Sequence, residues 1–235
     1  MKKFRLLMTK KTSPSLVLQA GLKGVDILEK EFIEVVLLKD KQLSAQVKEI
    51  ALLPHHIVFS SKNAVNAVAA MVGEVDAEWK IYCIEGATKE AAENEFGANK
   101  IVGTARNAGA LARTMLEQQG ISTVVFFCGD RRLDTLPDML RSNSVEVTEV
   151  VVYNTLPSPQ KIVDDFDAVA FFSPSAVRSF FTMNVLSDKV CCLSVGNTTS
   201  DAIRRYTPNK ILAAESPSEE VIIDMAIKLS NKNYY

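Results

Sequence analysis

The 235-residue chain has few side chains of the kinds that bind metal ions or form disulfides. None of its four cysteines belongs to a C-x-x-C pair, and all lie in or beside apolar runs, which predicts buried, reduced thiols in strands. The two histidines, His55 and His56, are adjacent, and neighbouring residues on a strand point to opposite faces. They therefore cannot bind one metal ion together, which argues against zinc catalysis and against a Ser-His nucleophile.

Long apolar runs and nucleotide-binding motifs are also missing. The sequence has no apolar run of about 18 residues, the length that a transmembrane helix requires. Residues 1–11 open with basic side chains, but their apolar run is too short for a signal peptide. Neither a glycine-rich dinucleotide fingerprint nor a P-loop occurs. We therefore expect a cytoplasmic protein that uses no cofactor, no metal and no membrane partner.

An excess of charge of one sign is the last absence. The net charge is −1, so the chain has no global basic field for nucleic acid, and any anion binding must be local. Hydrophobic residues make up 47% and charged residues 23%, which is typical of a globular protein.

An internal repeat is the most informative feature that is present. The pattern F-x-S-x-x-A-V begins at Phe59 and again at Phe171, and a later G-A/N-T segment begins at Gly86 and again at Gly196. The two pairs occur in the same order at nearly the same offset. This period is far longer than that of a solenoid repeat, which is roughly 20 to 50 residues. It predicts two similar globular halves with a ligand-binding cleft between them.

Short β-branched runs alternate with amphipathic stretches, which predicts an α/β fold with parallel sheets and crossover helices. Strands are expected at Phe4–Thr9, in part of 25–38, and at His56–Ser60, Lys80–Ile84, Lys100–Val102, Thr123–Cys128, Val145–Tyr153, Ala168–Phe172, Val190–Val195 and Lys210–Ala213. Helices are expected at Ala64–Val72, Lys89–Phe96, Ala105–Gln119, Leu133–Ser142, Ala176–Met183, Ser200–Tyr206 and Ser218–Asn231. Ten strands give five to each half, which fits two open, doubly wound sheets.

Two polar segments indicate linkers between the halves. Residues 39–42 and the proline-containing residues 154–159 each follow the second strand of a repeat unit. The domains are either consecutive or exchange their first two strands. Because crossings at these two segments produce the exchange, we favour a domain of residues 1–38 plus 156–235 and a second domain of residues 39–155.

Hydroxyl side chains stand where strands end and helices begin. Ser61 and Ser173 are placed as N-caps, Thr198 with Asp201 resembles a capping box, and residues 84–88 form the counterpart in the first half. Each such helix start offers unpaired N–H groups and the positive end of a helix dipole. Four of them suggest a ligand with several negative groups.

Each of these residues also has a simpler interpretation. A serine or threonine at a helix start can serve only as a cap, and Tyr153, before the second predicted linker, can be a half-buried aromatic. The residues alone therefore indicate a two-domain α/β protein that binds a polyanionic ligand.

The same segments resemble the uroporphyrinogen-III synthase family. The matching segments, in the family's order, are Val58–Val65, Glu85–Thr88, Cys128-Gly129 with Leu136-Pro137, Val152–Thr155, Phe171–Val177, Gly196–Thr199 and Ala214–Pro217. The chain departs from the family at Lys62, where proline is frequent, and at Glu85, where a small or apolar residue is common. A carboxylate beside an anion site should turn away, so we expect Glu85 to point out of the cleft.

The resemblance implies two flavodoxin-like domains, each an open five-stranded parallel sheet with helices on both faces, joined by two linkers. It implies a lyase of porphyrin (heme) biosynthesis that cyclises hydroxymethylbilane, a linear tetrapyrrole with eight carboxylates, to uroporphyrinogen III in the interdomain cleft. Water is lost and the last ring is inverted, without a metal or cofactor. The partner is this small molecule, not nucleic acid or a membrane, and the protein is expected to be a monomer.

The resemblance also implies roles for individual residues. Tyr153 is the catalytic candidate, because its phenol would help the substrate's hydroxyl to leave. The candidates for binding the substrate are Ser60, Ser61, Asn63, Thr88, Ser173, Ser175, Thr198 and Thr199. Two alternatives stay open at this point: a non-enzymatic two-lobed binding protein for a polyanionic small molecule, and a degenerate synthase paralogue that kept the fold.

Overall fold

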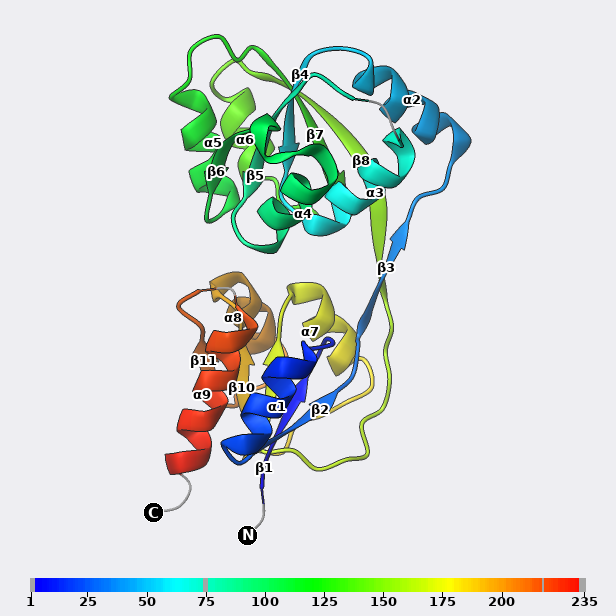
Figure 1. Ribbon diagram of the computed structural model, residues 1–235. Coiled ribbons are helices and arrows are strands. Elements are labelled where there is room, and N and C mark those ends of the chain that lie inside the picture. The colour runs from blue at the N-terminus through cyan, green and yellow to red at the C-terminus, as the bar shows by residue number, and fades with distance from the viewer. Residues whose placement is uncertain (1–2, 74–75, 217, 233–235) are drawn as a thin grey trace. The chain divides into compact units, whose positions relative to one another are not determined.

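The computed structural model describes residues 3–73, 76–216 and 218–232, which fold into two compact units (Figure 1). Unit 1 contains the chain up to Glu34 and again from Leu156, and unit 2 contains Val35–Thr155. The chain thus passes from unit 1 to unit 2 after Glu34 and returns to unit 1 after Thr155. The sequence predicted these two crossings after residues 38 and 155.

Unit 1 is built on a five-stranded sheet in the order β11-β10-β9-β1-β2, and its four neighbouring pairs of strands are parallel. Its strands are β1 (Phe4–Met8), β2 (Val25–Glu29), β9 (Ala168–Phe171), β10 (Cys191–Ser194) and β11 (Ile211–Ala213). Strand β1 pairs with β9, with Leu7 opposite Val169. One sheet therefore combines strands from both halves of the sequence.

Helices cover both faces of the unit 1 sheet (Figure 1). Leu6 and Met8 face α1 (Pro14–Leu22) and α9 (Glu219–Lys232), while Leu7 faces α7 (Pro174–Phe181) and α8 (Asn197–Arg204). Because successive side chains of a strand point to opposite faces, both sides of β1 are buried from Leu6 to Met8, which explains the apolar run at these three positions.

Unit 2 contains a six-stranded sheet in the order β3-β8-β7-β4-β5-β6. Its strands are β3 (Ile33–Leu37), β4 (His55–Phe59), β5 (Trp79–Ile84), β6 (Ile101–Ala105), β7 (Thr123–Gly129) and β8 (Glu146–Pro157). One face is covered by α2 (Lys41–Ala51), α3 (Lys62–Val72) and α4 (Ala87–Phe96), and the other by α5 (Ala108–Leu116) and α6 (Thr135–Arg141). A short 3₁₀ turn, Ala98–Lys100, precedes β6.

The prediction of five strands in each half was wrong for unit 2, where the described residues form six. The stretch 25–38 contains two strands, because Phe32 is fully buried in the core of unit 1 and separates β2 from β3. Leu38 donates its N–H to the Val152 carbonyl and Ser158 to that of Phe32, at 3.0 and 2.9 Å. Residue numbers rise on β3 as they fall on β8, so these neighbouring strands are antiparallel.

The two predicted linkers are largely parts of regular elements. Asp40 accepts a hydrogen bond from the Leu43 N–H at 2.9 Å, which makes Lys41 the first residue of α2. Strand β8 runs past Tyr153 to Pro157, with the Thr155 N–H bonded to Asp130 at 2.7 Å. Helices α1 and α2 were not predicted, although Pro14 at the start of α1 is a known helix-start signal.

The prediction about cysteine is confirmed. All four thiols are free and lie in strands, three of them buried and Cys191 partly so. Burial raises the pKa of Cys83 and Cys128 to about 11 and that of Cys192 to about 12.

In the described residues no group of three His, Cys, Asp or Glu side chains is placed to hold a metal ion, and no helix is long and apolar enough to cross a membrane.

Candidate active site

Each sheet has one point at which its chain connections reverse direction. In unit 1 the chain leads from β1 to one edge of the sheet and from β9 to the other, and in unit 2 the corresponding neighbours are β4 and β7. Open parallel sheets bind ligands at the carboxyl ends of the strands, at this switch point. The residues predicted to bind the substrate follow the carboxyl ends of strands in both units, whereas Tyr153 lies within β8.

At the switch point of unit 2, Ser61 follows β4 and caps α3. Its Oγ accepts a hydrogen bond from the Asn63 N–H at 3.2 Å, which confirms that Ser61 is an N-cap. Ser60, Ser61 and Asn63 are all half-buried. The strand end therefore presents polar side chains beside the positive end of α3, where the N–H groups of Asn63, Ala64 and Val65 donate to Ser61.

Tyr153 lies on β8, whose pairing with β7 slips next to it. Cys128 is opposite Val151 but Gly129 is opposite Tyr153, so Val152 is an extra residue. In a regular strand Val152 and Tyr153 would point to opposite faces. Here both side chains pack against the same core cluster, because the irregular pairing turns Tyr153 onto the same face of the sheet as Val152.

The Tyr153 ring covers Gly129. A Cβ on Gly129 would lie 2.8 Å from the phenol oxygen and closer still to Cζ and Cε2, so only glycine leaves room for this ring. Burial raises the pKa of the Tyr153 phenol, the adjacent Ser61 hydroxyl acts in the opposite direction, and Cys128 and Asp130 raise it further. The phenol therefore stays protonated at neutral pH and is a hydrogen-bond donor at the switch point.

Thr88 belongs to α4, which packs beside α3. The helix is preceded by Gly86 at φ 77°, a conformation that favours glycine. Thr88 is nearly buried, with 7% of its surface exposed, whereas the Glu85 side chain is exposed. The accessible binding groups at this helix start are thus its backbone N–H groups more than the threonine hydroxyl.

At the switch point of unit 1, Ser173 follows β9 and caps α7. Its Oγ accepts from the Ala176 N–H at 3.1 Å, and Pro174 is the first helical residue, as the sequence predicts. Ser175 Oγ accepts from the Arg178 guanidinium at 3.1 Å. A basic side chain is therefore held within the first turns of this helix.

The predicted capping box at Thr198 and Asp201 was wrong. Helix α8 begins at Asn197 after Gly196, so Thr198 and Thr199 are already helical, the first exposed and the second 3% exposed. Asp201 instead pairs with Arg204. In the described part of the chain no atom would lie within 4 Å of a Cβ on Gly196, so the backbone here is open to a ligand.

Lys10 is a further candidate for the site, and the sequence did not indicate it. It follows β1 at the switch point of unit 1, forms an ion pair with Glu219, and places its ammonium 5.1 Å from the centre of the Phe172 ring. The available signal was its position directly after the first predicted strand. The structure thus gathers Ser60, Ser61, Asn63 and Tyr153 at one switch point and Ser173, Ser175 and Lys10 at the other, with Thr88 and the pair Thr198 and Thr199 on neighbouring helices.

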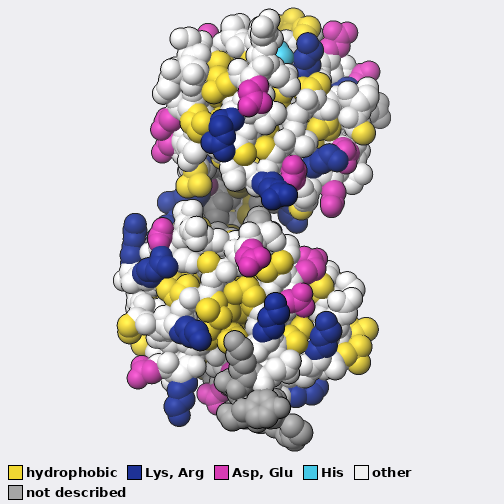
Figure 2. All heavy atoms as spheres, turned by 90° about the vertical axis from the view of Figure 1, so that its left-hand side faces the viewer, with side chains coloured by type: hydrophobic (Ala, Val, Ile, Leu, Met, Phe, Trp, Pro, Cys, Tyr) yellow, Lys and Arg dark blue, Asp and Glu magenta, His cyan; other side chains and the backbone are white. Residues whose placement is uncertain are grey.

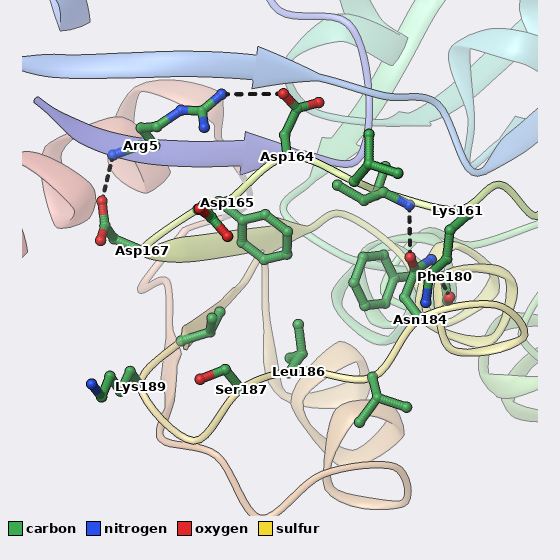
Figure 3. Close-up of a pocket in the computed structure, with 15 residues that line it drawn as sticks. Arg5, Lys161, Asp164, Asp165, Asp167, Phe180, Asn184, Leu186, Ser187 and Lys189 are labelled. Atoms are coloured by element: carbon green, nitrogen blue, oxygen red, sulfur yellow. Dashed lines mark hydrogen bonds and ion pairs between the residues drawn. The ribbon is translucent and has the colours of Figure 1, made fainter.

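A pocket of about 360 Å³ lies elsewhere in unit 1 (Figure 3). It is formed around residues 161–167 and 184–190, beside Arg5. The Arg5 N–H donates to Asp167 at 2.8 Å and its guanidinium lies 3.6 Å from Asp164. Because Asp167 precedes β9, this pocket is at the amino ends of the strands, and no predicted site residue lines it.

Charges are mixed on one face of the molecule. On the face shown in Figure 2, Lys and Arg side chains alternate with Asp and Glu side chains within each unit. On this face a polyanion would therefore be bound by local groups, such as helix starts and hydroxyls, more than by a broad basic area.

The caps allow one stability prediction. Ser173→Ala should lower the free energy of unfolding by about 1 kcal/mol, because the Ala176 N–H loses its acceptor. Ser175→Ala is the matched control, since Ser175 Oγ accepts from a side chain and not from the backbone. Urea unfolding followed by circular dichroism measures both, and equal stability of the two variants would show that the cap contributes nothing.

Comparisons with known proteins agree with the fold described above. A family model described as "Uroporphyrinogen-III synthase HemD" matches residues 17–224. A mutant uroporphyrinogen III synthase from Thermus thermophilus superposes with a TM-score of 0.68 at 16% identity, covering 98% of this chain and 99% of that one. The uroporphyrinogen-III synthetase of Helicobacter pylori gives 0.65 at 16% identity, covering 96% and 99%. At these identities the structures establish a shared fold, and because the family model spans most of the sequence, the chain belongs to the uroporphyrinogen-III synthase family.

Proposed function

We propose that the chain cyclises hydroxymethylbilane to uroporphyrinogen III with the residues at the carboxyl ends of its two sheets. Loss of the substrate's hydroxyl gives an azafulvene cation, which is attacked by the substituted position of the terminal ring to form a spiro intermediate. Reopening and reclosure invert that ring. Since the free substrate can cyclise without inversion, the main task of the protein is to hold the substrate in the geometry that leads to inversion.

Tyr153 assists departure of the hydroxyl. The observation that carries this role is a protonated phenol held at the switch point of unit 2, between Gly129 and Ser61. Its raised pKa means that it does not ionise near neutral pH, so it donates a hydrogen bond to the leaving oxygen. The effect is greatest in the transition state, where negative charge grows on that oxygen.

The helix starts bind the substrate's carboxylates. Those of α3 and α7 combine the positive end of a helix with a cap serine, and that of α8 exposes the backbone at Gly196 and the hydroxyl of Thr198. Each helix N-terminus carries about half a positive charge. Several such sites neutralise a polyanion although the net charge of the chain is −1.

The proposal also includes the fold of the two units and the exchange of strands between them. Each unit is a flavodoxin-like domain. Strands β2-β1-β9-β10-β11 follow the order 2-1-3-4-5 of that fold, and β8-β7-β4-β5-β6 follow the same order when β7 and β8 are counted first, as the opening strands of the second repeat. The domains exchange strands at the two crossings, and β3 is an addition to the second sheet. The enzyme works as a monomer without an added metal or cofactor.

The test is the identity of the product. Purified protein, incubated with freshly generated hydroxymethylbilane, is expected to form the type III isomer, with and without a chelator. Only the non-inverted type I isomer, at the rate of the protein-free control, would contradict the proposal. If substrate nevertheless binds, that outcome identifies a binding protein or a degenerate synthase. Loss of activity with the chelator, restored by a metal, would contradict the cofactor-free part alone.

Thr198→Ala should mainly raise KM. The exposed hydroxyl is proposed to bind a carboxylate, and a hydrogen bond is worth about 0.5 to 3 kcal/mol, so KM should rise roughly 2- to 150-fold with kcat nearly unchanged. Thr88→Ala should act in the same direction, but Thr88 is nearly buried and its loss also affects packing.

Thr182→Ala provides the control for this prediction. Thr182 lies at the other end of α7 and donates its hydroxyl to the Arg178 carbonyl at 3.0 Å. Its KM should equal that of the unmodified enzyme. An equal KM for Thr198→Ala would remove Thr198 from the binding site.

A further inference from the structure

Two strand glycines of unit 2 lie beneath tyrosine rings. Gly129, at the end of β7, is covered by Tyr153, and Gly103, in β6, is covered by Tyr82, whose Cδ1 would be 2.7 Å from a Cβ. Glycine in a strand often marks such a close approach. The two pairs differ in place, because Gly129 lies at the switch point while Gly103 lies within an edge strand.

We propose that Gly129 is a positioning residue for catalysis: by lacking a side chain it lets the Tyr153 ring lie across β7 and brings the phenol to Ser61. This inference rests on the proposed role of Tyr153. It adds that the donor's position is fixed by the adjacent strand, and that the irregular pairing at Cys128 and Gly129 is what points the ring there.

The packing around the ring explains why the effect should be specific. The atoms nearest to the missing Cβ are the phenol oxygen, Cζ and Cε2, all at the reactive end of the side chain. A rigid ring cannot bend away from a methyl group there, so it must rotate as a whole. Rotation removes the phenol from Ser61 and from its buried surroundings, which lowers the phenol pKa towards its ordinary value.

A double-mutant cycle tests this coupling. The variants are Gly129→Ala, Tyr153→Ala and both together, with kcat and KM measured for each. Gly129→Ala alone should lower kcat about 10- to 100-fold, as loss of the phenol would. With Tyr153 already replaced by alanine, the same change should lower kcat by less than about twofold, because no ring remains to be displaced. If the kcat of the double variant is a further 10- to 100-fold below that of Tyr153→Ala, the proposal is overturned.

Two further variants serve as controls. Gly103→Ala introduces the same kind of clash with Tyr82 away from the switch point, so the folded enzyme should keep its kcat. Gly21→Ala, within α1, adds a methyl group where the described residues leave open space, and should also keep kcat. A loss of kcat with Gly103→Ala equal to that with Gly129→Ala would attribute the effect to general disturbance of the sheet.

A spectroscopic titration separates failure of this inference from failure of the proposed function. In Gly129→Ala one tyrosine should ionise at lower pH than in the unmodified protein, near its ordinary value of about 10. That shift without any effect of Tyr153→Ala on kcat would support positioning and remove Tyr153 from the chemistry. The opposite outcome is a lower kcat for Tyr153→Ala with unchanged kcat and unchanged tyrosine pKa for Gly129→Ala. It would keep Tyr153 in the chemistry and overturn the positioning role of Gly129.

Folding of the variants is itself informative. If Gly129→Ala does not fold but the double variant does, the clash with the ring is confirmed by the rescue. If neither folds, alanine is incompatible with the strand itself, and the proposal is wrong.

Discussion

Replacing Tyr153 by phenylalanine is expected to lower kcat about 10- to 100-fold, with KM within about twofold of the unmodified enzyme. The phenyl ring keeps the packing over Gly129 and against the core, so only the hydroxyl that donates to the leaving oxygen is lost. The expected loss is at the low end of general-acid effects because backbone donors and a substrate carboxylate share the task. Steady-state kinetics, with circular dichroism to confirm folding, measure it.

Tyr82→Phe is the matched control for this substitution. Tyr82 is a buried tyrosine of the same sheet, and its hydroxyl donates to Gln118 Oε1 at 2.6 Å, away from the switch point. It should lose some stability but keep kcat. If Tyr153→Phe also keeps kcat, Tyr153 has no part in the chemistry, and the site acts through shape and charge alone.

The largest effect on stability is expected for Phe180→Ala. Its fully buried ring lies 5.1 Å from the ring of Phe32 and 5.3 Å from that of Phe171, in the core between α7 and the unit 1 sheet. Removing a buried phenylalanine typically costs about 3 to 5 kcal/mol, through lost burial and the cavity left behind. The free energy of unfolding from urea titration should fall by that amount.

Leu18→Ala provides the comparison. Leu18 lies on α1 with 66% of its surface exposed, so its loss should change the free energy of unfolding by no more than about 0.5 kcal/mol. Equal effects of the two substitutions would mean that Phe180 is not part of a tightly packed core.

The sequence predicted features whose signals are local. Ser61 and Ser173 were expected as caps, and both accept the hydrogen bond of a first-turn N–H. Where two local signals compete, the prediction failed: Thr198 suggested a cap, but the chain already turns into the helix after Gly196. Likewise, the polar residues 39–42 suggested a linker, whereas capping by Asp40 makes Lys41 the first residue of α2.

Features that depend on contacts between distant segments were not predictable from the sequence. Tyr153 was selected through the family resemblance. No residue pattern in 146–157 predicts the irregular pairing that places its ring over Gly129. The ion pair between Lys10 and Glu219 joins residues near opposite ends of the chain. Such contacts follow from strand order, which residue patterns alone leave open.

The binding of a polyanion at the carboxyl ends of the strands is tested most directly by amide chemical shifts. ¹⁵N-labelled protein would be titrated with uroporphyrin III, the stable oxidised form of the product, which keeps all eight carboxylates. The expected result is shifts at the helix starts, including the amides of Asn63, Ala176 and Thr198. Shifts confined to the amino-end pocket, at Asp164–Asp167 and Ser187–Lys189, would contradict the assignment of the site.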